Sequence, residues 1–283
     1  MSFLVLILTL VIEKLSNWRQ ALQQDQWWYE QLKRCNKLLP QQHTLALILA
    51  LSLPVVALAL LLIALKSVMY GLLLIPVHLL ILLYSLSRGD LRAALGPFRD
   101  AWRRQDTHAA SLAAQRDLLI QSEEPAGLLQ AVQGNLLWQG FQGFFVVIFF
   151  YLIGGPIAAL TYRLLVLTAE QSQWPQAAGV ATRFLHVLDW LPARLLSISF
   201  ALIGNFNTVN QVLMPDLLCI NEPANNLLSK TGRAAVEAPS EALGEKGTRT
   251  LDDIWLLLVR SAVLWYASIA VWTIFLLGHL LAL

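Results

Sequence analysis

The sequence has little charge. Only 13% of its 283 residues are Asp, Glu, Lys or Arg, whereas 57% are hydrophobic, and the mean hydropathy is +0.59. A composition this poor in charge excludes an ordinary soluble globular protein and indicates a polytopic membrane protein in a lipid bilayer. The formal net charge of +2 gives no reason to expect a nucleic-acid partner.

Cysteine is also scarce. Cys35 and Cys219 are too few for a disulfide framework, and their spacing is not that of metal ligands. The sequence also lacks a P-loop, a Gly-Xaa-Ser-Xaa-Gly elbow and a His-Glu-Xaa-Xaa-His motif. These absences predict reduced thiols, no metal, no cofactor and no assigned catalytic residue.

Long apolar runs are plentiful by contrast. Residues 44–65 and 67–86 are each about twenty residues long, enough to cross a bilayer, and only Lys66 separates them. They predict a transmembrane hairpin within residues 44–86. Residues 254–283 predict a C-terminal transmembrane helix.

The N-terminal segment, residues 1–39, differs in character. Residues 1–12 are apolar but too short to cross a bilayer alone. Residues 13–39 alternate apolar and polar positions at helical spacing, with Trp27 and Trp28 among them, which is typical of a helix lying at the membrane surface.

Basic residues cluster on both sides of the predicted hairpin. Because Lys and Arg concentrate in cytoplasmic loops, both flanking segments are expected to face the cytoplasm, and residues 87–140 to form cytoplasmic polar helices. Residues 205–253 are expected to form a polar loop that contains one short helix, in "NNLLSKTGRAAV". The basic residues are Lys14, Arg19, Lys33, Arg34 and Lys37 before the hairpin, and Arg88, Arg92, Arg99, Arg103, Arg104 and Arg116 after it.

The central stretch, residues 141–204, joins membrane-grade hydrophobicity to ionisable groups. Its apolar run, residues 141–168, is interrupted by Gly154-Gly155-Pro156, a sequence that kinks or breaks a helix. The run therefore either crosses once with a kink or forms a re-entrant hairpin opened at these three residues. Residues 195–203 are short for a span and either return across the membrane or re-enter it.

Charged groups near hydrocarbon are expensive, so those of the central stretch are expected to pair or to line a wet cavity. Arg183, His186 and Asp189 recur every three residues and share roughly one helix face. Either they clamp the helix before Pro192 or they hold a ligand. Arg163 and Arg194 are the other ionisable side chains concerned.

The segments "LLWQGFQGFFVVIFFYLIGGPIAALTYRL" and "ATRFLHVLDWLPARL" resemble the AmpE family of inner-membrane proteins linked to β-lactamase induction. The likeness runs from the opening "LTLVIEKL" to the C-terminal membrane helix. The family pattern Arg-x-Asp-Ser/Thr-His-Ala falls on Arg104, Asp106, Thr107, His108 and Ala109. Two interpretations stay open. Either Asp106 or Thr107 caps a helix that begins here, or the side chains of this motif face a ligand.

The middle of the chain resembles the CobD/CbiB synthases more distantly. Where those enzymes carry acidic motifs, this sequence has residues such as Trp138, Gln139 and Val166. Without carboxylates, a Mg²⁺-dependent nucleotide reaction loses its means of neutralising charge. An enzyme is therefore the less favoured reading.

The expected fold is an all-α integral membrane protein, a single polytopic domain of the CobD/CbiB-like type with a broken or re-entrant helix at Gly154-Gly155-Pro156. The resemblance implies a bacterial inner-membrane modulator of signalling between peptidoglycan recycling and β-lactamase induction. The alternatives are a CobD-like enzyme with altered chemistry, and a scaffold for another protein's helix. Expected partners are a small anionic ligand, phosphate-bearing or muropeptide-like, and a single-pass membrane protein or a second copy of the chain.

Basic and imidazole groups outnumber carboxylates among the candidate ligand-binding residues, which suits an anion. The candidates are Arg104, Asp106, His108, Asn135, Trp138, Arg163, Arg183, His186, Asp189 and Arg194. A partner helix is expected to contact small residues that permit close approach, namely Gly154, Gly155, Ala158 and Ala159.

Overall fold

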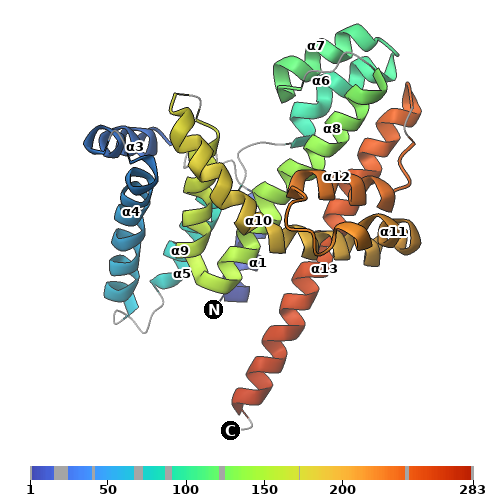
Figure 1. The fold of residues 1–283 in the computed structure, drawn as a ribbon. Helices are drawn as coiled ribbons and strands as arrows, with labels where there is room; N and C mark the ends of the chain where they lie inside the picture. Colours follow the sequence, from blue (N-terminus) through green and yellow to red (C-terminus); the bar gives the residue numbers. More distant parts are fainter. Residues whose placement is uncertain are drawn as a thin grey trace. The chain divides into compact units, whose positions relative to one another are not determined.

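In the residues that the computed structural model describes, every regular element is a helix, as the sequence predicts (Figure 1). The chain divides into two compact units, and the single membrane domain stays a prediction. Unit 1 takes its residues from 1–88 and 146–188, and unit 2 from 89–145 and 189–283. The structure describes residues 2–15, 25–39, 42–66, 73–86, 91–120, 125–171, 173–239 and 242–281.

Four helices in the described ranges are long and apolar enough to cross a membrane. They are His43–Lys66, Gly127–Ala169, Pro175–Ile203 and Glu245–Phe275. Their outward apolar side chains, such as Leu53, Leu60 and Ile63 of the first, are more than half exposed in the isolated chain. Lipid accounts for such surfaces, since a soluble monomer rarely shows large continuous apolar patches. The chain is thus a multi-pass membrane protein.

Unit 1 contains helices α1, α3, α4, α5 and α9 and the first part of α10. The amphipathic α3 buries Trp28, Leu32 and Cys35, which recur at helical spacing, and it lies across the end of α4 (Figure 1). The bounds are Ser2–Leu15 for α1, Gln26–Leu38 for α3, His43–Lys66 for α4, Leu74–Ser85 for α5, Val146–Ala169 for α9 and Pro175–Ile203 for α10.

Helix α9 is broken at Gly155, where φ is 65° and ψ is −156°. The apolar helix from Gly127 to Ala169 has 43 residues, and a straight helix of that length would measure about 65 Å. That is about twice the ~30 Å hydrocarbon thickness of a bilayer. The Phe150 and Tyr162 rings nevertheless stack with centroids 5.3 Å apart, whereas twelve residues of straight helix advance about 18 Å. The arms on either side of Gly155 therefore fold back on each other.

Unit 2 contains α6, α7, α8, a π-helical turn, the second part of α10, α11, α12 and α13. Helix α8 packs against α12 through small residues: an added Cβ at Gly232 would lie 2.6 Å from Leu137 Cδ1. The bounds are Leu91–Arg103 for α6, Thr107–Leu118 for α7, Pro125–Gly140 for α8, Phe141–Phe145 for the π-helical turn, Phe206–Asp216 for α11, Ala224–Ala235 for α12 and Glu245–Leu281 for α13.

Three boundaries differ from those expected. Residues 195–203 are the last turns of α10, which continues through Pro192, because a proline kinks a helix without always ending it. Besides the expected short helix, which is α12, the 205–253 segment contains α11 and the start of α13. Asn205 caps α11 by accepting a hydrogen bond from Thr208 N. Of the expected span 67–86, α5 covers Leu74–Ser85, while residues 67–72, like Arg19 and Arg88, lie outside the described residues.

Candidate binding sites

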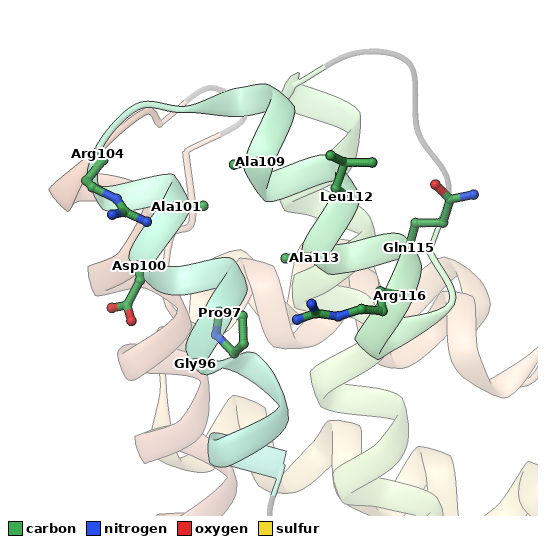
Figure 2. Close-up of a pocket in the computed structure, with 10 residues that line it drawn as sticks. All are labelled: Gly96, Pro97, Asp100, Ala101, Arg104, Ala109, Leu112, Ala113, Gln115 and Arg116. Carbon is green, nitrogen blue, oxygen red and sulfur yellow. The ribbon is translucent and has the colours of Figure 1, made fainter.

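A groove in unit 2 lies between α6 and α7 (Figure 2). The chain reverses between these helices at Gln105, whose φ is 62°. Asp106 then caps α7, its side chain accepting a 2.9 Å hydrogen bond from Ala109 N. Small residues on the facing sides, such as Gly96, Ala109 and Ala113, leave an open cavity of about 820 Å³.

Two arginines and one carboxylate line this groove, namely Arg104, Arg116 and Asp100. The Arg116 side chain extends from α7 toward α6 (Figure 2). Arg116 also forms a two-point ion pair with Asp117, at 2.7 and 2.8 Å. These hydrogen bonds, together with the charge of Arg116, lower the pKa of the Asp117 carboxyl. The groove therefore offers cationic side chains over an apolar floor.

The structure separates the three predicted residues of this region. Arg104 lines the groove, whereas Asp106 serves as the α7 cap. His108 is exposed in the first turn of α7. Arg116 was not a predicted site residue; only its place in a run of basic residues pointed to it.

Asn135 and Trp138 lie on α8. The Asn135 Oδ1 accepts a 3.3 Å hydrogen bond from Gln139 Nε2, one turn later. The Trp138 ring contacts the Phe141 ring, with centroids 5.5 Å apart. Both side chains thus contact neighbours on their own helical stretch.

Arg163 is buried in unit 1, on the second arm of α9. Among the described residues its buried Nε atom has no hydrogen-bond partner. Tyr29 of α3 lies close enough to Arg163 to interact with its charge. The pKa of Tyr29 is raised, mainly by burial and then by the negative charge of Glu170, and the positive charge of Arg163 partly offsets this rise. A buried, incompletely bonded guanidinium is costly, so this position is a second candidate site.

Neighbouring contacts tie the Arg163 region to α3. Trp28 Nε1 donates to Thr168 Oγ1 at 3.2 Å, which joins α3 to the end of α9. The Tyr84 hydroxyl donates to Asp25 Oδ1 at 2.9 Å, which joins the end of α5 to the start of α3. Gln31 Nε2 donates to the Ala50 carbonyl of α4 at 2.6 Å. Three apolar helices therefore meet the surface helix at one end of unit 1.

Helix α10 carries Arg183, His186 and Asp189 on successive turns. Arg183 and His186 are exposed, and Asp189 is buried. Arg183 also lines a second pocket, with residues at the start of α4. Whether His186 and Asp189 clamp the helix before Pro192 or hold a ligand stays a prediction.

Arg194 forms its hydrogen bonds within its own unit. Its guanidinium donates to the carbonyls of Cys219 at 2.6 Å, Leu217 at 3.1 Å and Trp190 at 3.1 Å. It also lies over the Trp190 ring, 4.6 Å from the centroid. Only 3% of the residue is exposed. This arginine holds the segment after α11 against α10.

The predicted partner-helix wall is only partly accessible. Gly154 is exposed, beside Ile153, whereas Ala159 is buried. An added Cβ at Gly154 would approach the Cβ of Ala158 to 2.7 Å, so the bend itself requires a glycine there. The role of the wall in contacting a partner helix stays a prediction.

In the part of the chain that the structure describes, no three His, Cys, Asp or Glu residues gather where they could hold a metal ion.

The helices and their sites define an all-helical, multi-pass membrane protein. The family model described as "Regulatory signalling modulator protein AmpE" matches residues 1–221. The chain therefore belongs to the AmpE family, a family of signalling modulators. Protein AmpE of Shigella flexneri is 31% identical over 159 residues, which cover 52% of this chain and 56% of that protein. The chain thus spans little more than half the length of this curated relative, and no solved structure matches it significantly.

Proposed function

We propose that this chain modulates signalling between peptidoglycan recycling and β-lactamase induction, from the bacterial inner membrane, by binding a small anionic ligand in the α6–α7 groove. Membership of the AmpE family supports the signalling role. The observation that carries the ligand proposal is Arg104, an exposed arginine that lines an open cavity. Guanidinium groups bind phosphate and carboxylate with paired hydrogen bonds.

The position of the groove suits a ligand that arrives from water. Helices α6 and α7 lie outside the four long apolar helices. They carry most of the basic residues that follow the predicted hairpin, and the positive-inside bias favours a cytoplasmic position for such a segment. A muropeptide carries carboxylates, which match the cationic side chains that line the groove.

Binding to purified protein tests the proposal. Muropeptides from digested peptidoglycan are titrated into the detergent-solubilised chain by calorimetry. Arg104→Gln is expected to weaken binding about tenfold, as one charge-assisted hydrogen bond requires. Arg103→Gln is the matched control, because Arg103 is the exposed neighbour outside the groove lining. Equal binding by the two variants would exclude the groove as the ligand site.

A scaffold role is the second candidate, favoured by the exposure of Gly154 and Ile153 at the bend of α9. A partner transmembrane helix would contact these residues. A photocrosslinker at Ile153 is expected to capture a membrane protein under this hypothesis; capture of lipid alone would oppose it.

A further inference from the structure

A second pocket lies wholly in unit 1, where the start of α4 meets the first turns of α10. Its volume is about 600 Å³. Residues 42–45 form one wall, and residues of α10 from Pro175 to Arg183 form the other. It shares no lining residue with the α6–α7 groove.

The pocket has cationic character. Arg183 and His43 are the ionisable side chains among its described lining residues, which include no Asp or Glu. Asn36 Oδ1 lies 3.2 Å from Nδ1 of His43 and orients the imidazole. Gln42, Thr44 and Gln176 add neutral polar groups. This set suits a phosphate, which accepts several hydrogen bonds and carries negative charge.

The pocket also lies where two apolar helices begin. Both α4 and α10 are long and apolar enough to cross a membrane, so their starts belong at the boundary between water and hydrocarbon. The amphipathic α3 supports this position, because it bonds to Ala50 of α4 through Gln31 and to the end of α9 through Trp28.

An apolar surface continues from the pocket along both helices. On α4 it consists of Leu45, Ile48 and Leu49, and on α10 of Phe184 and Val187, all large apolar side chains exposed in the isolated chain. A molecule with an anionic head and long apolar chains would match the pocket and this surface together.

We propose that the pocket binds the phosphate headgroup of an anionic phospholipid. Arg183 donates hydrogen bonds to the phosphate, His43 and the neighbouring polar side chains contact the headgroup, and the acyl chains lie along the exposed faces of α4 and α10. This site is separate from the proposed signalling groove and does not depend on it.

Native mass spectrometry of the full chain tests the proposal, after reconstitution in nanodiscs of equal phosphatidylglycerol and phosphatidylcholine. The wild type is expected to retain phosphatidylglycerol in preference to phosphatidylcholine. Arg183→Gln is expected to lower its retention about tenfold, because one charged donor to phosphate is lost. Lys66→Gln, which removes an exposed cation at the opposite end of α4, is expected to have no effect.

Two results would overturn the proposal. One is equal retention of phosphatidylglycerol by Arg183→Gln and the wild type, with circular dichroism confirming that both are folded. The other is complete displacement of the lipid by soluble glycerol phosphate, since the occupant would then be a free phosphate rather than a lipid.

Discussion

Arg194 and the α6–α7 groove use the same functional group for different purposes. At Arg194 the guanidinium donates to three backbone carbonyls and is 3% exposed. In the groove, Arg104 is exposed and lines an open cavity. Arg116 lines the same cavity but already donates to Asp117 at two points. An arginine whose donors are consumed by its own chain stabilises the fold, whereas an arginine that faces an open cavity is available to a ligand.

Arg163 lies between these two cases. It is as buried as a structural arginine, yet its Nε atom has no hydrogen-bond partner among the described residues. Burial alone therefore does not separate a structural arginine from a functional one. The number of satisfied donors does so more directly.

Replacing Arg194 should have the largest effect on stability. Arg194→Ala removes three charge-assisted hydrogen bonds, two of which join α10 to the segment after α11, so we expect a loss of about 3 kcal/mol in the free energy of unfolding. Arg183→Ala, an exposed arginine on the same helix, should change stability by less than about 0.5 kcal/mol. Denaturant unfolding in detergent measures both, and equal effects would remove the distinction between the two kinds of arginine.

Replacing Gly155 tests whether unit 1 is stabilised by its backbone bend rather than by a side chain. Its φ of 65° and ψ of −156° belong to a region that glycine alone adopts readily, so Gly155→Ala should cost about 1 to 3 kcal/mol. Gly179→Ala should have the opposite sign and stabilise by up to about 1 kcal/mol, since Gly179 is helical and an added Cβ meets no atom within 4 Å. Thermal unfolding of the pair checks both signs.

Next to the groove, Asp106 should act as a structural cap of α7. Asp106→Ala removes the cap of α7 and should cost about 1 kcal/mol, whereas Asp106→Asn should be nearly neutral because Asn caps equally well. If Asp106→Asn keeps its stability but binds the ligand more weakly than the wild type, the carboxylate has a role in recognition beyond capping. Unfolding and muropeptide titration of the same variants make the comparison.

Local features of the sequence predicted much of this structure. The apolar runs predicted the long helices, Gly154-Gly155-Pro156 predicted the interruption of α9, and the position of Asp106 before α7 offered capping as one reading. Each of these three features is set by residues that lie close together in the sequence.

Features that depend on tertiary packing could not be predicted. The carbonyls that accept from Arg194 include those of Leu217 and Cys219, more than twenty residues further on. Arg116 joins Arg104 only because α6 and α7 pack as a hairpin, and Arg183 joins His43 only because α10 begins beside α4. No periodicity in the sequence encodes those pairings.

The most direct test of the central claim is β-lactamase induction in cells that depend on this chain. Arg104→Gln should leave the free energy of unfolding within about 0.5 kcal/mol of the wild type, as is usual for an exposed residue, and should abolish the chain's effect on the ratio of induced to basal β-lactamase activity. Arg103→Gln should leave that ratio unchanged. A wild-type ratio in Arg104→Gln cells, at equal membrane abundance, would contradict the account.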